Sequence, residues 1–79
     1  PVRDTLTLDV VFPRATAFAF VREILSPEML SLQPEPKFAF DEDGDGSGLV
    51  HTEVLGPSAY IYALAAVAER MGATRQRYD

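Results

Sequence analysis

The chain has 79 residues, which is enough for one small domain, and its 47% content of hydrophobic residues argues against intrinsic disorder. A net charge of −5 disfavours binding to the phosphate backbone of nucleic acids. The absence of cysteine excludes disulfides and thiolate chemistry, and no apolar run reaches the roughly 20 residues that a membrane-spanning helix needs. We therefore expect a soluble cytoplasmic protein that binds neither nucleic acid nor membrane.

The N-terminal third predicts one strand followed by two helices. Residues 4–12 alternate with Leu6, Leu8 and Val10 on one face, which is typical of a half-buried β-strand. Residues 13–25 predict an amphipathic helix that begins with a proline. Its expected core stripe, flanked by Phe20 and Ile24, is Ala15, Phe18, Val21 and Leu25. The motif Ser26-Pro27-Glu28 then predicts the capped start of a short second helix that ends near residue 32.

The remaining chain predicts a β-hairpin and a final helix. Residues 37–41 and 49–55 alternate as strands, and the acidic, glycine-rich segment between them is expected to form the turn. Residues 58–71 have apolar side chains at helical spacing, and Gly72 is a typical residue after a helix end. We interpret Arg70, Arg75 and Arg77 as a solvated basic end of the chain.

Together these elements predict a single α+β domain over residues 1–79. Its order is β-α-β-β-α, with an extra helical turn after the first helix. A three-stranded antiparallel or mixed sheet would carry the helices on one face, as a two-layer sandwich. Such a sheet has open edges, and the last helix is rich in alanine, which permits close approach of another element. We therefore predict a homodimer.

The segment 41–48 resembles part of a calcium-binding loop. Asp41, Asp43, Asp45 and Gly46 match the first half of an EF-hand, D-x-D-x-D-G. The twelfth position, which needs a glutamate, is Thr52, and the flanking segments predict strands in place of helices. A solvated acidic turn is the favoured interpretation, and a weak calcium site formed by the three aspartates is the alternative.

Two further residues are candidates for chemistry. Pro1 would act as a general base if its amine were the chain terminus. Members of the tautomerase family begin with such a proline. This chain is similar to that family at Pro1 and in the β-α order that follows. His51 lies on the same strand face as Glu53, but a single histidine without a second ligand nearby makes a poor zinc site. We therefore predict no catalytic residue, no metal and no cofactor, with Pro1 as the low-ranked alternative.

One resemblance concerns the order of the elements. The segments that carry it are Val11-Phe12-Pro13, Ala17-Phe18-Ala19-Phe20-Val21, Ser26-Pro27-Glu28 and the turn Asp43-Gly44-Asp45-Gly46. In this order the first 55 residues resemble the opening of an SRPBCC or START-like helix-grip domain, and the final helix is similar to its long C-terminal helix. A complete member has several more strands. The resemblance implies an apolar ligand held between a curved sheet and that helix.

The sequence as a whole favours a non-enzymatic binding or interaction module. Its expected ligand is a small apolar molecule or a protein, bound in a groove between the sheet and the helices. The candidate groove residues, which are also the predicted core, are Phe18, Phe20, Phe38, Phe40, Tyr60 and Leu64. A domain of this size has few apolar residues to spare, so the core is the favoured interpretation of this set.

Overall fold

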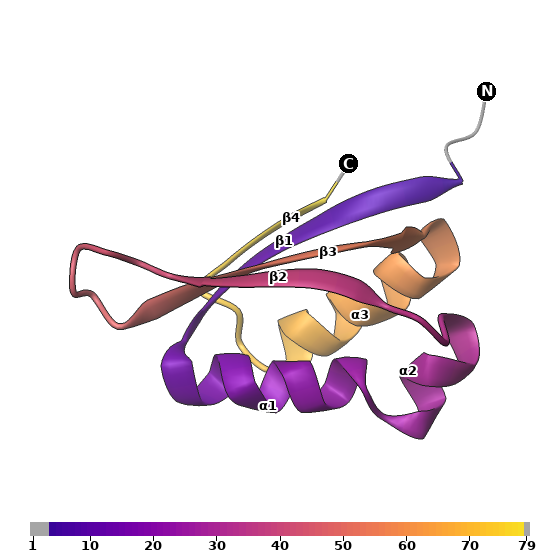
Figure 1. Ribbon diagram of the computed structural model, residues 1–79, viewed down its shortest axis with the longest axis horizontal. Helices are drawn as coiled ribbons and strands as arrows, with labels where there is room; N and C mark the ends of the chain where they lie inside the picture. The colour runs from indigo at the N-terminus through magenta and orange to yellow at the C-terminus, as the bar shows by residue number, and fades with distance from the viewer. Residues whose placement is uncertain (1–3, 79) are drawn as a thin grey trace.

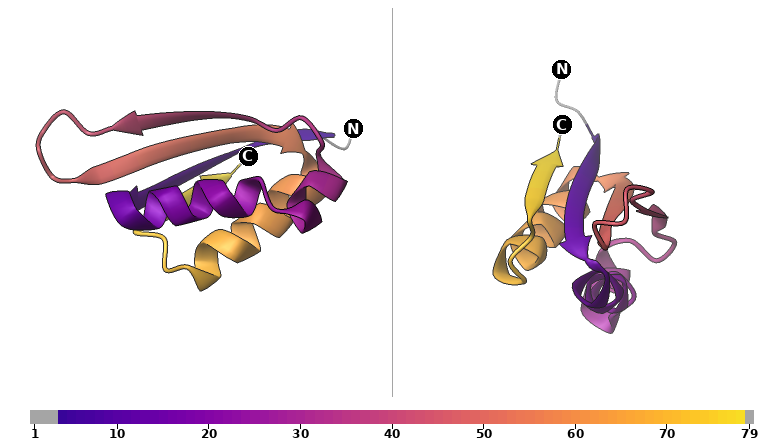
Figure 2. Two further views of the ribbon diagram at one scale, coloured as in Figure 1. Left: turned by 60° about the horizontal axis from the view of Figure 1, so that its bottom comes forward. Right: turned by 90° about the vertical axis from the view of Figure 1, so that its left-hand side faces the viewer.

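The fold is an antiparallel sheet with three helices on one of its faces (Figure 1). A computed structural model describes residues 4–78 of the chain. The elements in chain order are β1 (Thr5–Pro13), α1 (Arg14–Ile24), α2 (Pro27–Leu32), β2 (Lys37–Glu42), β3 (Leu49–Pro57), α3 (Ser58–Arg70) and β4 (Arg75–Tyr78). Figure 2 shows from two further sides that the helices lie below the sheet and leave its other face uncovered.

The sheet has four strands in the order β2-β3-β1-β4, and every neighbouring pair is antiparallel. Our prediction of an α+β fold with the helices on one face is confirmed, but the predicted three-stranded sheet is wrong by one strand. With α2 as an insertion, the element order β-α-β-β-α-β is that of the split β-α-β, or ferredoxin-like, arrangement. This arrangement hosts many unrelated functions and assigns none to the chain.

The missed strand is β4, which we had interpreted as a solvated basic end. The helix before it ends in a Schellman motif, in which Gly72 has a φ of 75° and the Ala73 N–H donates to the Ala68 carbonyl. This turn directs the chain back along β1, where the Thr74 N–H donates to the Val11 carbonyl. With only four residues, two of them arginine, β4 has too little apolar alternation to be detected in the sequence.

The hydrophobic core lies between the sheet and the helices. The strands contribute alternate residues, as predicted for β1 and β3, and α3 contributes Tyr60, Ile61, Leu64, Ala65 and Ala68. The fully buried large side chains are Tyr60, Phe12, Phe20, Leu8, Ile24, Ile61, Leu64, Val10, Val50, Val54 and Thr52. The rings of Phe12 and Phe20 meet at a centroid distance of 5.1 Å, which ties α1 to the strand that precedes it.

Helix α1 presents a different face to the core from the one that we predicted. Its buried residues are Ala17, Phe20 and Ile24, whereas Phe18 and Leu25 of the predicted stripe are 53% and 50% exposed. The helix is apolar on two adjacent faces, so periodicity alone does not decide which face packs on the sheet. The other apolar face of α1 therefore remains on the surface of the monomer.

Both long helices start directly from the end of a strand. Pro13 and Pro57 each occupy the N-cap position, where they offer no side-chain cap. A carbonyl from another segment replaces the cap in each case: the Arg14 N–H donates to Gly48 and the Ser58 N–H to Asp4. Within residues 4–78, none of the helices is long and apolar enough to cross a lipid bilayer.

Candidate functional site

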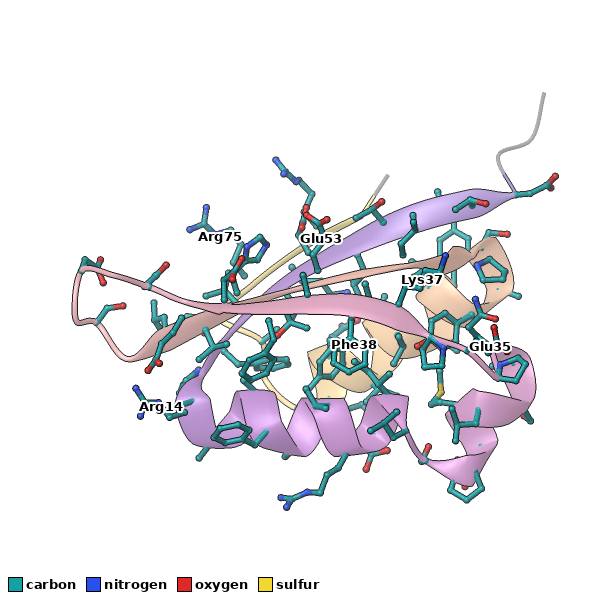
Figure 3. The ribbon with its side chains drawn as sticks, viewed as in Figure 1. Arg14, Glu35, Lys37, Phe38, Glu53 and Arg75 are labelled. Carbon is teal, nitrogen blue, oxygen red and sulfur yellow. The ribbon has the colours of Figure 1, made fainter. Side chains whose placement is uncertain are left out.

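The uncovered face of the sheet, which we call the open face, carries a cluster of ionisable side chains. Asp9 on β1 lies directly opposite Glu53 on β3, and His51 follows two residues from Glu53 on the same face. One ligand-type atom from each of the three side chains lies within 4.8 Å of the others. Figure 3 shows that Glu53 and Arg75 point away from the helices, whereas Phe38 points toward them. We call Asp9, His51 and Glu53 the acid–histidine cluster.

Asp9 is the member of this cluster whose two carboxylate oxygens both have a partner. Its Oδ1 is 3.1 Å from His51 Nε2, and its Oδ2 accepts a hydrogen bond of 3.3 Å from Arg77 Nη2. The Asp9 side chain is 20% exposed, while the side chains of His51 and Arg77 are 42% and 77% exposed. Arg77 reaches Asp9 because β4 pairs these two residues directly across from each other. The extra strand thus completes the polar site.

An open concavity of about 320 Å³ adjoins the cluster. Its walls are Asp9, Val11, Asp43, Leu49, His51, Arg75 and Arg77. The polar groups on these walls are carboxylates, one imidazole and two guanidinium groups. The His51–Asp9 pair is suited to binding an ion or a small polar group.

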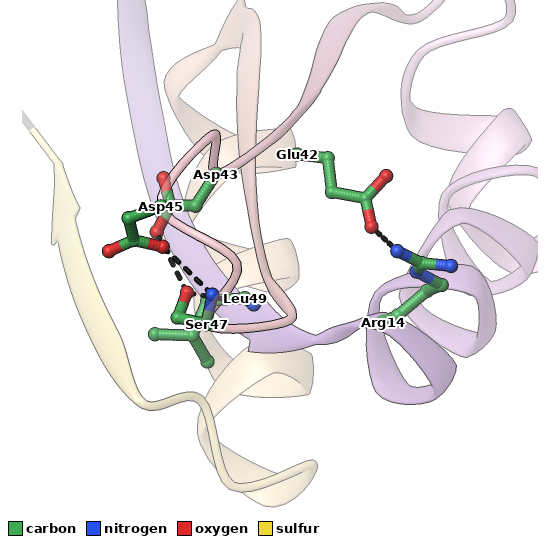
Figure 4. Close-up of polar contacts among 6 residues, drawn as sticks. All are labelled: Arg14, Glu42, Asp43, Asp45, Ser47 and Leu49. Carbon is green, nitrogen blue, oxygen red and sulfur yellow. Dashed lines mark hydrogen bonds and ion pairs between the residues drawn. The ribbon is translucent and has the colours of Figure 1, made fainter.

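The acidic turn at 43–48 satisfies its own hydrogen bonds (Figure 4). Asp45 Oδ1 accepts the Ser47 N–H at 2.9 Å, and Ser47 Oγ in turn accepts the Leu49 N–H at 3.2 Å. Hydrogen bonds to Asp45 from Ser47, first from its backbone N–H and then from its side chain, lower the pKa of the Asp45 carboxyl. The ion pair between Arg14 and Glu42 holds the base of the hairpin against α1. The hydrogen bond from the Ser47 N–H to the Asp45 side chain is typical of an Asx turn, which the alternation of Asp and Gly favours.

The three aspartates predicted as an alternative calcium site do not converge. Among residues 4–78, Asp9, His51 and Glu53 are the one group of three ligand-type side chains whose atoms come this close together. Asp41, Asp43 and Asp45 are all exposed, and Asp41 lies within β2 opposite His51. The structure therefore favours the turn interpretation of the segment. Pro1, the candidate general base, lies outside the described residues.

The residues predicted to line an apolar groove lie in three different environments. Phe20, Tyr60 and Leu64 are completely buried in the core. Phe38 and Phe40, on the core-facing side of β2, are only partly buried. Phe18 is exposed on α1, and its ring stacks on Phe40 at a centroid distance of 5.6 Å and an interplanar angle of 22°.

An apolar surface therefore continues from the edge strand β2 onto the second apolar face of α1. We call this surface, formed by Phe18, Val21, Leu25, Phe38 and Phe40, the edge surface. Phe18, which the sequence assigned to the groove, is the residue that connects its two parts through its contact with Phe40.

Sequence reasoning placed His51 beside Glu53 but found no second ligand near them, and the structure corrects this. Asp9 is 42 residues away from His51 in the chain and reaches it through the pairing of β1 with β3. The alternation of residues 4–12 already implies that Asp9 lies on the face opposite Leu8 and Val10. The missing information was the register, which neither strand specifies alone.

Comparison of this chain with protein-family models, with curated proteins and with solved structures finds no match.

Proposed function

We propose that this chain is a non-enzymatic interaction module that forms a homodimer through the free edge of β2. The observation that carries the proposal is the order of charges and phenylalanines along this strand. β2 pairs with β3 on one side and is the last strand of the sheet on the other. Its outer N–H and C=O groups are therefore available to another strand.

A two-fold axis through Ala39, perpendicular to the sheet, pairs β2 with its own copy in a favourable way. In this antiparallel register Lys37 lies opposite the partner's Asp41, twice per dimer. Phe38 lies opposite the partner's Phe40 on the core side. Opposite charges and aromatic pairs directly across two strands each stabilise a sheet. Because a two-fold contact is closed, it produces a dimer and not a fibre.

Neighbouring registers lose these contacts. Shifting the axis to Phe38 places Lys37 opposite the partner's Ala39, and it limits the pairing to residues 37–39 unless Pro36, which has no N–H, joins the ladder. Shifting it to Phe40 places Phe38 opposite the carboxylate of the partner's Glu42. The register centred on Ala39 is the one that matches both the charges and the aromatic rings within β2.

The edge surface supplies the apolar area that such a dimer would bury. Phe18 on α1 is 53% exposed, and Leu25, the residue that caps the end of α1, is 50% exposed. Continuing the sheet beyond β2 would place the partner's strand over Phe38 and Phe40 and bring the two α1 helices together. The open face is a poor alternative interface because its acids and arginines would lose their hydration there.

Charge exchange on β2 tests this proposal. Lys37→Asp or Asp41→Lys alone turns both cross-strand attractions into repulsions. Each should weaken the dimer by about 2 kcal/mol, on the order of thirtyfold in its dissociation constant. The double variant Lys37→Asp/Asp41→Lys restores opposite charges and should restore the dimer. Sedimentation velocity over a wide concentration range measures the association, and circular dichroism verifies that each variant is folded.

A second pair of variants tests the edge surface. Phe18→Ala should weaken the dimer, whereas Tyr62→Ala, which shortens a similarly exposed aromatic residue (55%) on α3, should leave it unchanged. A wild-type chain that stays monomeric at every concentration refutes the proposal. Single charge variants that dimerise as well as the wild type, or a double variant that fails to recover, refute the register. Capture of a different protein by a monomeric chain would point to another partner for the same edge.

A further inference from the structure

We infer that the acid–histidine cluster is a binding site for one divalent transition-metal ion of the zinc class. The site is independent of the dimer interface proposed above, because Asp9, His51 and Glu53 lie on the open face of the two central strands. One imidazole and two carboxylates are ligand types that Zn²⁺ accepts. The imidazole discriminates against Ca²⁺ and Mg²⁺, which prefer oxygen ligands alone.

The separations within the cluster agree with ligands that share one ion. His51 Nε2 and Asp9 Oδ1 are 3.1 Å apart, and Glu53 offers an oxygen within 4.8 Å of both. Two ligands bound at about 2.0–2.1 Å from one ion lie about 2.9–3.4 Å apart in octahedral or tetrahedral geometry. The His51–Asp9 separation already falls in this range. Glu53 is exposed, so its side chain has room to rotate toward the other two ligands.

The surroundings of Asp9 match those of a metal-ligating carboxylate. Its Oδ2 is held by Arg77, which leaves Oδ1 directed at His51 and fixes the orientation of the carboxylate. Hydrogen bonds of this kind to the non-ligating oxygen orient the ligands of metal sites. The backbone adds rigidity, since all three ligands come from the paired central strands β1 and β3 and none comes from a loop.

Three protein ligands leave at least one coordination position to be filled by water or by a small anion. The concavity of about 320 Å³ lies on this side of the cluster, and the guanidinium of Arg75 on its wall has no ion-pair or hydrogen-bond partner within residues 4–78. An anionic group bound to the metal would therefore also meet a free guanidinium. The positive charge of the two arginines lowers the affinity for the bare cation, and the two carboxylates offset it.

A titration of the untagged protein with ZnCl₂, measured by isothermal titration calorimetry, tests the site. We expect one Zn²⁺ per chain, and Co²⁺ at the same site should give visible absorption bands of a four- or five-coordinate ion. His51→Ala should remove binding, and Glu53→Gln should weaken it by at least about tenfold. The matched control is Asp43→Asn, which changes an acid on the wall of the same concavity but outside the ligand set, and binding should persist there.

Several results would overturn the inference. They are an absence of Zn²⁺ binding at millimolar concentration, binding that survives both His51→Ala and Glu53→Gln, or an equal loss of binding in Asp43→Asn. Measuring Zn²⁺ affinity in the Lys37→Asp variant separates this inference from the dimer. A monomeric variant that still binds Zn²⁺ confirms the independence of the two sites, whereas a variant that is monomeric and metal-free contradicts it. A histidine nitrogen NMR shift at His51 Nε2 on Zn²⁺ addition provides a readout that a merely stabilising role would not give.

Discussion

The hydroxyl of Tyr60 makes the stability of the fold sensitive to high pH. Tyr60 begins the buried stripe of α3, and its side chain is completely inaccessible to solvent. Within the described part of the chain, its Oη has no hydrogen-bond partner. Burial raises the pKa of this phenol from 10.0 to about 12, because the phenolate would lose its hydration in the core. Folding thus favours the neutral form of Tyr60.

The sign and size of the effect follow from this pKa. Below pH 10 the phenol is neutral in both the folded and the unfolded chain, so the full stability is present. As the pH rises through 10 the unfolded chain begins to ionise, and stability falls until the folded chain also ionises near pH 12. A pKa that rises from 10.0 to about 12 on folding corresponds to a loss of about 3 kcal/mol of stability, of which about 1.4 kcal/mol is already lost at pH 11.

Tyr60→Phe removes this ionisable hydroxyl and tests the reasoning. Urea unfolding of the wild type and the variant, measured from pH 8 to pH 11.5, gives the difference in their free energies of unfolding. At pH 8 the variant should be as stable as the wild type or about 1 kcal/mol more stable, because it loses an unpaired buried hydroxyl. This difference should grow by about 1.4 kcal/mol on going to pH 11.

The comparison isolates Tyr60, since every other ionisable group is present in both proteins. Tyr62→Phe is a suitable second control, because it removes the hydroxyl of a side chain on the same helix that is 55% exposed. A difference between the wild type and Tyr60→Phe that stays constant from pH 8 to pH 11.5 would refute the reasoning. It would show that the hydroxyl is solvated in the folded chain.

Two further substitutions probe the core. Gly56→Ala places a Cβ 2.7 Å from Tyr60 Cδ2, and since that ring is buried we expect a loss of about 1–3 kcal/mol by urea unfolding, whereas Gly44→Ala meets nothing within 4 Å and should change little. Thr52→Val removes a buried Oγ1 that has no hydrogen-bond partner in the described residues. The free energy of unfolding should increase by about 1 kcal/mol, and the melting temperature should rise with it. A lower melting temperature would reveal a bound water at that position.

Local signals in the sequence were sufficient where one interaction dominates. The alternation of Leu6, Leu8 and Val10 predicted the buried face of β1, because one face of this strand carries only apolar residues. Ser26 was predicted as a cap, and its Oγ accepts the Met29 N–H at 3.3 Å. Gly72 was predicted as a helix stop and adopts the left-handed conformation that favours glycine.

Features that depend on tertiary pairing could not be read in the same way. Phe18 and Phe20 have similar hydrophobicity, and only the position of β1 and β3 above α1 decides that Phe20 is buried and Phe18 exposed. The contact between Asp9 and His51 requires the β1–β3 register, which two separate alternating patterns do not contain. The strand β4 exists because β1 offers it a free edge, and its own sequence has little strand character.

The charges on the two edge strands indicate why one edge would associate and the other would not. On β4 the arginines 75 and 77 flank Gln76, so an antiparallel copy centred on Gln76 would place like charges opposite each other, which destabilises a sheet. Gln76 itself is turned inward and donates from Nε2 to the Ala65 carbonyl. On β2, Lys37 and Asp41 flank Ala39 with opposite charges, so the same operation brings together residues that attract. One sheet therefore carries a self-repelling edge beside the acid–histidine cluster and a self-complementary edge beside the exposed face of α1.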